Sequence, residues 1–393
     1  MTLGAVSQAP AAPASTALAE DPAERPSRVG SLDAARGVML ILSVSAEAVL
    51  APRPEAFVHT KWVGLHYYDW IFPLFVTLSG CGMAFAFRNH VRWRRNARRA
   101  LVLVLAGLAY NYVAAPERGL ADLRFTGVLQ LYAALVVLVA LLHHWLRSAR
   151  AWIAFTLVWS GLLTLFWFAV SRDCVGGMPQ PTCNPTLTVE GAWLGGLDHL
   201  YRLGKRGFET EGILGILGAL SIASAGVVVG HLLADRHRQR HTVARLLAWA
   251  ATVAIAGWAF AQVVPALKWL WTPSYGLITA TAGVLLLTLA YAVVDTGPHR
   301  AIGYRLAYPL RALGRNSLLV YFGSHVLMTT LVHLPPGSPR GESLAARLSA
   351  TAPPGIEPAL WLVVIALAAW TALACVLHAR GLYLRPSGPA RRR

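Results

Sequence analysis

Apolar segments long enough to approach or cross a lipid bilayer recur along the whole of this 393-residue chain. A membrane-spanning helix needs about 20 mostly apolar residues. Hydrophobic residues make up 56% of the chain and charged residues only 13%, whereas soluble domains carry about a quarter charged residues. We therefore predict an all-α, polytopic integral membrane bundle of about ten transmembrane helices. The ten segments lie at roughly 32–50, 64–87, 100–115, 126–146, 151–170, 210–234, 243–264, 275–295, 316–334 and 358–378.

The basic residues predict the orientation of these helices. If both termini are cytoplasmic, the cytoplasmic loops hold roughly twice as many Lys and Arg residues as the loops on the other side, as the positive-inside rule requires. The net charge of +17 is then a consequence of topology, and we expect no nucleic-acid partner. This orientation makes 171–208 a long extracytoplasmic loop. Cys174 and Cys183 lie in that loop, where an oxidising compartment favours a disulfide, with two free thiols as the alternative.

The ends of the chain differ in composition from the apolar middle. Residues 1–27 are rich in Ala and Pro and lack the basic and apolar regions of a signal peptide, so we expect a disordered cytoplasmic tail. Residues 28–380 form the predicted transmembrane domain, and residues 381–393 form a basic cytoplasmic tail.

An unusual group of titratable residues lies in HTKWVGLHYYDWIFPLFVTLSG, residues 59–80. If a helix begins near Gly64, His66 and Asp69 are three residues apart and share one of its faces. His59 lies just before that helix, in an aqueous loop. Such groups are costly at a membrane boundary unless they pair or line a wet cavity. Three interpretations are open: an amphipathic belt at the headgroups, a metal site that is short of ligands, and acid–base or nucleophilic chemistry by a histidine.

Several motifs along the chain resemble, in order, those of the heparan-α-glucosaminide N-acetyltransferase family. That family moves an acetyl group from cytosolic acetyl-CoA to a sugar amine across a membrane. The matching stretches are RVGSLDAARGVMLIL (28–42), the stretch 59–80, TGVLQ (126–130), LDHLYR (197–202) with ETEGILGIL (209–217), LWTPSY (270–275) and GRNSLLVYFGSHVL (314–327). Any one of these motifs alone is weak, and their shared order is the signal.

The resemblance implies roles for individual residues. His59 corresponds to the family's extracytoplasmic catalytic histidine, acting as general base or as acyl carrier. Asp69 or Glu211 would orient its imidazole, although Glu211 could instead cap a helix. Three positions depart from the family pattern: Glu47 replaces a common Asn, Leu131 replaces the Arg of the family's L-Q-R, and His325 lies one position later than expected.

The same resemblance implies a donor site and an acceptor site, with acetyl-CoA as acyl donor and no metal. Polar residues within apolar segments could line a path for CoA, or could simply bond a neighbouring helix. Aromatic residues near the outer boundary could stack on a sugar, or could anchor the protein in the membrane. The expected CoA-binding residues are Arg36, Gln130, Arg315, Asn316 and Ser317, together with the basic cluster 88–99. The expected acceptor-binding residues are Trp62, Asp198, His199, Tyr201 and Trp271.

We therefore expect a transmembrane acyltransferase that modifies an amino sugar or glycan outside the cytoplasm. The high Arg, Ala and Pro usage favours a bacterial plasma membrane, with the active site open to the outside. The bilayer and the glycan acceptor are its expected partners, and a homodimer is left open. The alternatives are an O-acyltransferase of envelope polysaccharide, a proton-coupled transporter that uses Glu47 and Asp69, and a scaffold without catalysis.

Overall fold

The computed structural model describes residues 29–114, 123–193, 202–203, 206–207, 209–235, 241–335 and 342–384. The predicted tail 1–27 lies outside these residues. Of the predicted tail 381–393, only residues 381–384 are described.

Each of the ten predicted apolar segments forms a helix in the described part of the chain. These helices are α1 (Gly30–Ala48), α2 (Tyr67–Phe87), α3 (Trp93–Ala114), α4 (Val128–Leu142), α5 (Ala149–Val170), α7 (Ile213–Ala234), α8 (Thr242–Ala261), α9 (Pro273–Ala290), α12 (Ser317–His333) and α14 (Pro358–Ala379). Six of them are long and apolar enough to cross a membrane: α2, α5, α7, α8, α14 and α9 with its π-helical extension η7 (Tyr291–Asp295). The shorter α4 and α12 are also apolar. The prediction of an all-α polytopic membrane protein is confirmed.

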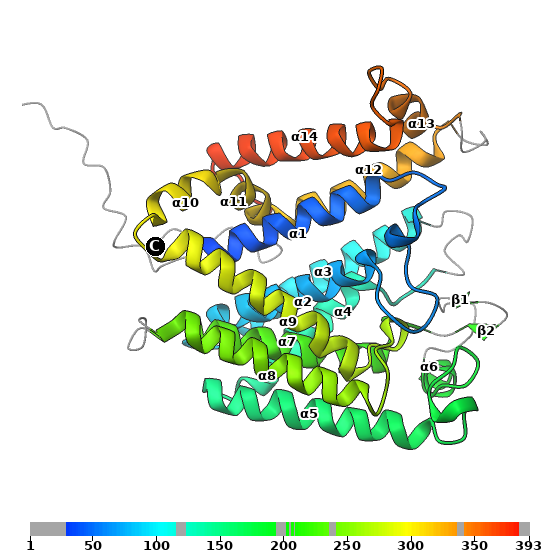
Figure 1. The fold of residues 1–393 in the computed structure, drawn as a ribbon, viewed down its shortest axis with the longest axis vertical. Coiled ribbons are helices and arrows are strands. Elements are labelled where there is room, and N and C mark those ends of the chain that lie inside the picture. The colour runs from blue at the N-terminus through cyan, green and yellow to red at the C-terminus, as the bar shows by residue number, and fades with distance from the viewer. Residues whose placement is uncertain are drawn as a thin grey trace, which may run out of the picture.

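The long helices run side by side, and the short elements lie at the two ends of the bundle (Figure 1). At one end lie α6 (Thr186–Trp193), α13 (Leu344–Ser349) and the two-residue strands β1 (Arg202–Leu203) and β2 (Arg206–Gly207), which pair antiparallel. At the other end lie α10 (Arg300–Leu306) and α11 (Tyr308–Arg315). Single 3₁₀ turns complete the described elements: η1 (Glu55–Phe57), η3 (Val175–Gly177) and η6 (Lys268–Leu270).

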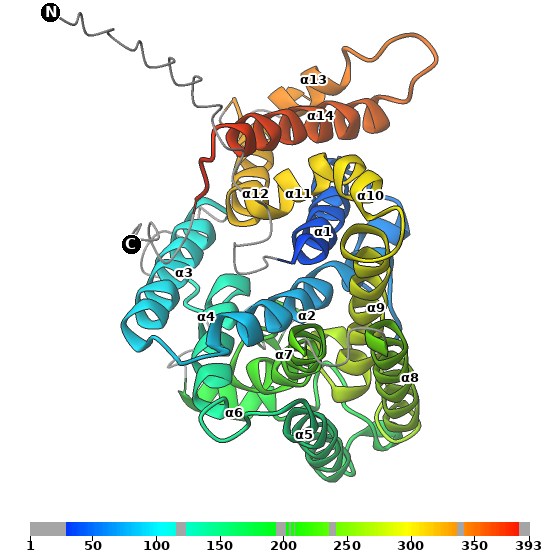
Figure 2. The same cartoon turned by 90° about the vertical axis from the view of Figure 1, so that its left-hand side faces the viewer.

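Helices α2 and α7 form the centre of the bundle (Figure 2). In the apolar window of α7, 83% of the residues are buried, against 11% in that of α14, so α14 is a peripheral helix. The two central backbones touch directly. A Cβ on Gly80 would lie 2.0 Å from the carbonyl oxygen of Ala223, and one on Gly226 would lie 2.0 Å from that of Thr77. Small residues at helix crossings in membranes permit this close approach.

Helix α2 begins later than the sequence predicted. It starts at Tyr67, and Gly64 lies in the preceding loop with a φ of +102°. The Asp69 carboxylate accepts a hydrogen bond of 2.9 Å from the backbone N–H of His66, which fixes the helix start there. His59 and His66 therefore both belong to a loop that leads into the helix.

The structure contains a disulfide between Cys174 and Cys183, which confirms the bridge expected from the sequence. It closes a turn in which Gln180 and Cys183 also exchange backbone hydrogen bonds. The carbonyl of Pro179 in this turn accepts a hydrogen bond of 2.9 Å from the Trp62 indole. The bridged loop is thereby tied to the segment that carries His59.

Candidate active site

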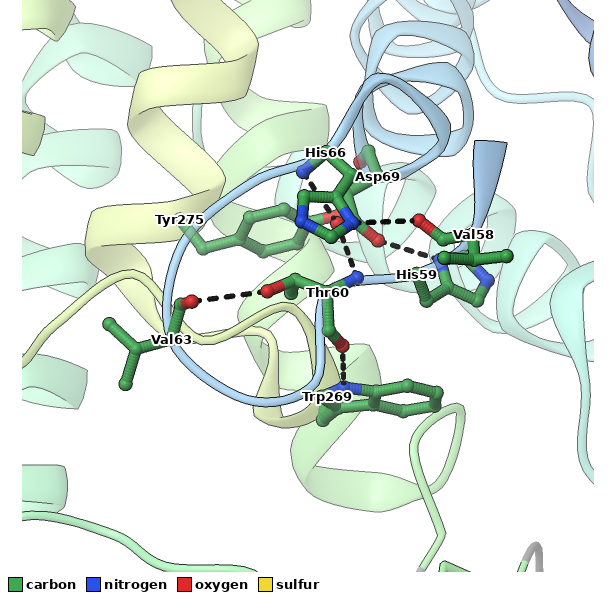
Figure 3. Close-up of polar contacts among 8 residues, drawn as sticks. All are labelled: Val58, His59, Thr60, Val63, His66, Asp69, Trp269 and Tyr275. Atoms are coloured by element: carbon green, nitrogen blue, oxygen red, sulfur yellow. Dashed lines mark hydrogen bonds and ion pairs between the residues drawn. The ribbon is translucent and has the colours of Figure 1, made fainter. Parts of the chain in front are cut away.

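His59 and Asp69 form a hydrogen-bonded pair at the entrance to α2 (Figure 3). His59 Nδ1 lies 2.6 Å from Asp69 Oδ1, and Asp69 Oδ2 accepts the backbone N–H of Thr60 at 3.1 Å. An ionised carboxylate only accepts hydrogen bonds, so Nδ1 carries the proton and Nε2 presents its lone pair. The Asp69 side chain is fully buried while that of His59 is 32% exposed, so a molecule outside the protein can reach the imidazole.

Residues from distant segments hold this pair in place. The Trp269 indole, in η6, donates to the carbonyl of Thr60 at 2.8 Å, and the Tyr275 hydroxyl, at the start of α9, donates to that of Asp69 at 2.8 Å. The rings of Tyr68 and Trp269 contact the imidazole edge-on, with centroids 4.6 Å and 5.4 Å away. The imidazole is therefore oriented by packing as well as by its hydrogen bond.

Burial and a nearby ammonium group make His59 less basic than a free histidine. Burial, and then the charge of Lys268, lower the pKa of His59 below its usual 6.5, against the opposite effect of Asp69. The Lys268 ammonium is itself buried and lies 3.9 Å from the centre of the Trp269 ring. A lowered pKa leaves the imidazole neutral at pH 7, the form that can accept a proton.

Glu211 belongs to an ion-pair network beside this pair and does not contact the imidazole in any described interaction. Its Oε2 lies 2.5 Å from Nη2 of Arg124, whose guanidinium also pairs with Glu209. Burial opposes ionisation, but Arg124 and Lys268 keep the pKa of Glu211 below its usual value. The charge of Glu211 in turn raises the pKa of His59.

The capping role considered for Glu211 is filled by another carboxylate. Glu190, on α6, accepts the backbone N–H of Leu214 in the first turn of α7 at 3.0 Å. Glu190 is fully buried, and burial raises its pKa. We did not predict Lys268, Arg124, Glu209 or Glu190 as site residues from the sequence, because their partners come from segments far away along the chain.

The aromatic residues expected to bind an acceptor are mainly used for packing. Trp271 is 1% exposed, has a left-handed backbone with a φ of +51°, and packs edge-on against Phe72 at 5.1 Å. Trp62 packs against a second apolar cluster that includes Trp167 and Trp269. Trp271 therefore offers no open surface on which a sugar could stack, whereas Trp62 is half-buried. The other expected acceptor residues, Asp198, His199 and Tyr201, lie outside the described residues.

A cavity of about 250 Å³ opens toward the end of the bundle opposite His59. Three arginines line it: Arg36 in the second turn of α1, Arg99 on α3 and Arg315 at the end of α11. Ser79 and Ser317 add hydroxyl groups, and the remaining wall is mainly apolar and aromatic. Clustered guanidinium groups bind phosphates, so the cavity suits a ligand with an anionic head and a less polar arm.

A smaller cavity of about 20 Å³ adjoins the first, since Leu129 and Tyr321 line both. Its wall includes Gln130 and His325. Among the described residues, neither the amide oxygen nor the amide nitrogen of Gln130 has a hydrogen-bond partner. Asn316, by contrast, is fully buried, donates to the carbonyl of Ala312 at 3.0 Å and lines neither cavity. Thus Arg36, Gln130, Arg315 and Ser317 face cavities and Asn316 does not.

The fold and the site define an integral membrane protein with a histidine–carboxylate pair at one end of its helices and an arginine-lined cavity at the other. The family described as "Heparan-alpha-glucosaminide N-acetyltransferase, catalytic" matches residues 28–263, and the chain belongs to this family. This confirms the resemblance drawn from the motifs.

Two curated relatives carry the name heparan-alpha-glucosaminide N-acetyltransferase. The chain is 26% identical to that of Homo sapiens over 369 residues, which cover 77% of this chain and 53% of the relative. It is 24% identical to that of Mus musculus over 360 residues, covering 76% of this chain and 54% of the relative. The chain thus spans about half the length of the curated relatives it matches.

Proposed function

We propose that this protein is a transmembrane acetyltransferase. It takes an acetyl group from acetyl-CoA in the arginine-lined cavity and transfers it to the amine of an amino sugar or glycan at His59. The observation that carries this proposal is the His59–Asp69 pair, whose imidazole is oriented, neutral at pH 7 and partly exposed. Family membership supports the reaction class.

His59 acts as the general base of the transfer. Its Nε2 takes a proton from the acceptor amine while the amine nitrogen attacks the thioester carbonyl. The carbon–sulfur bond then breaks, and CoA leaves as a thiolate. Asp69 stabilises the imidazolium that forms, and the charge of Glu211 acts in the same direction. In the alternative scheme, Nε2 first accepts the acetyl group and then passes it to the amine.

The cavity residues fit acetyl-CoA, which supplies the activated acetyl group. Arg36, Arg99 and Arg315 would hold its phosphates, and Ser317 would add a hydrogen bond at the cavity wall. The amide of Gln130, with no partner among the described residues, would bond an amide of the pantetheine arm.

The distribution of basic residues supports a cytoplasmic location for this cavity. The loops at the arginine-lined end are the richer in Lys and Arg, so His59 faces the outside. The acceptor is then a glycan of the cell envelope, and Asp198, His199 and Tyr201 belong to the loop on its side of the membrane. The host membrane is the bacterial plasma membrane.

The test is transfer by purified full-length protein in detergent, with acetyl-labelled CoA and glucosamine as the acceptor probe. We expect labelled N-acetylglucosamine with the wild type and none with His59→Ala. His333→Gln is the matched control, because His333 is an exposed histidine at the same end of the bundle, bonded only to the carbonyl of Thr329 among its described contacts. Product that persists in His59→Ala would contradict the proposal.

A further inference from the structure

A second histidine–carboxylate pair lies deeper in the bundle. Nε2 of His325, on α12, is 3.5 Å from Oε2 of Glu47, in the last turn of α1. Their side chains are only 12% and 14% exposed. Both are positions at which the chain departs from the family's motifs, and the structure brings them together.

The hydrogen bonds around His325 determine where its protons lie. Its Nδ1 is 2.8 Å from the carbonyl oxygen of Tyr321. A carbonyl can only accept, so Nδ1 carries a hydrogen and Nε2 faces Glu47. When the pair holds one titratable proton, that proton lies on Nε2 or on the carboxyl group, and the pair is neutral overall. A buried pair of this kind can give up or take back one proton.

This pair lies between the donor cavity and His59. Ser317, Tyr321 and His325 follow each other at four-residue intervals and so share one face of α12. Ser317 and Tyr321 line the large cavity, while Tyr321 and His325 line the small one that adjoins it.

On the other side, the pair approaches His59 through Tyr68. The Tyr68 hydroxyl donates to Glu47 Oε2 at 3.5 Å, and the Tyr68 ring contacts the His59 imidazole. A thioester that moves from the large cavity toward His59 would therefore pass His325.

Among the described residues, the titratable groups that act on Glu47 or His325 are Tyr68 on α2, Tyr110 on α3 and Tyr321 on α12. Arg53, in the loop after α1, acts on Tyr68, and Tyr132 on α4 acts on Tyr321. Phenols ordinarily titrate near pH 10, and arginine remains charged. The phenols therefore keep their protons near neutral pH.

We propose that the Glu47–His325 pair is the general acid of the acetyl transfer, donating its shared proton to the sulfur of the departing CoA. This rests on the proposed function. As the carbon–sulfur bond breaks, its electron pair goes to sulfur, and the proton from His325 Nε2 converts the thiolate into the thiol. The pair is left as a Glu47 carboxylate and a neutral imidazole. It recovers a proton from water in the donor cavity once CoA has left, while His59 releases the amine's proton on the other side.

The pH dependence of kcat distinguishes a general acid from a structural pair. His59 must be neutral, so activity falls as the pH drops through its pKa. The Glu47–His325 pair must be protonated, so activity falls again as the pH rises. We expect His325→Gln to lower kcat by about 10²-fold and to abolish the alkaline limb while the acid limb of His59 remains. Glu47→Gln should move the alkaline limb to lower pH, because the imidazolium loses its carboxylate.

A leaving-group comparison provides a second readout. With S-phenyl thioacetate, whose thiol is far more acidic than that of CoA, the loss caused by His325→Gln should shrink to a few-fold, since this thiolate departs without a proton. His333→Gln again serves as the control on the same helix. An unchanged alkaline limb in His325→Gln, or an equal loss with both donors, would overturn the proposal.

If His325→Gln does not fold, the nearly isosteric Glu47→Gln decides by the same criterion. A wild type inactive at every pH would instead refute the proposed function.

Discussion

At the residue scale, burial and then the buried ammonium of Lys268 determine how basic His59 is. Lys268 lowers the pKa of His59, so removing its charge should raise that pKa toward 6.5. Since the neutral imidazole is the active form, we predict that Lys268→Met moves the acid limb of kcat/KM to higher pH. Lys61→Met, which changes an exposed lysine two residues from His59, should leave the limb in place. An unmoved acid limb in Lys268→Met would contradict this account of the site.

Asp69 controls which nitrogen of His59 carries the proton. An Asn amide at this position can turn its N–H toward Nδ1, which then places the proton on Nε2 and removes the base. We predict that Asp69→Asn lowers kcat by about 10³–10⁴-fold with little change in stability. Asp173→Asn, an exposed aspartate in the bridged loop, is the matched control. Activity within tenfold of the wild type would show that Asp69 does not orient the imidazole.

Only part of the site was predictable from the sequence, and its contacts show why. His59 and Asp69 are ten residues apart, and their stretch stood out because titratable groups are rare beside apolar segments. Lys268 and Arg124 were counted only as loop charges. Their effect on the site depends on their burial and on contacts with partners such as Glu211. Both arise only when helices that are distant in the sequence pack together.

At the scale of elements, the crossing of α2 and α7 depends on glycine. A Cβ on Gly226 would collide with the backbone of Thr77, so we predict that Gly226→Ala destabilises the protein by about 1–3 kcal/mol. Gly161→Ala on α5 is the matched control, because its Cβ would meet only Phe260 at 3.8 Å. Thermal unfolding in detergent measures both. Equal melting temperatures for the two variants would show that α2 and α7 accommodate a Cβ at Gly226 without a loss of stability, which would contradict the prediction.

The elements themselves were well predicted where long apolar runs define them. All ten predicted segments coincide with helices, because backbone groups in a bilayer must be satisfied within the helix. Helix α11 was missed, since its basic residues made 296–315 look like a loop. It forms because it packs against α1, where Gly37 and Gly314 bring the two backbones into contact. The start of α2 was misplaced because the Asp69 cap is a local polar contact rather than an apolar pattern.

At the scale of the whole molecule, α1 connects the two ends of the proposed reaction path. Arg36 and Glu47 are eleven residues apart, about three turns and therefore on the same helix face, separated by about 16 Å along the axis. Arg36 lines the donor cavity, and Glu47 lies beside His325 and Tyr68. One side of a single helix thus runs from the proposed phosphate site to the proposed site of bond cleavage.

Transfer between two separated compartments tests the central claim most directly. Sealed inverted vesicles containing the wild type or His59→Ala would receive acetyl-labelled CoA outside, on the cytoplasmic face, with glucosamine trapped in the lumen. We predict labelled N-acetylglucosamine in the lumen with the wild type alone, and none when donor and acceptor exchange sides. Product that forms only when donor and acceptor share one compartment would contradict transfer across the membrane. Uptake of glucosamine without any need for CoA would identify a transporter instead.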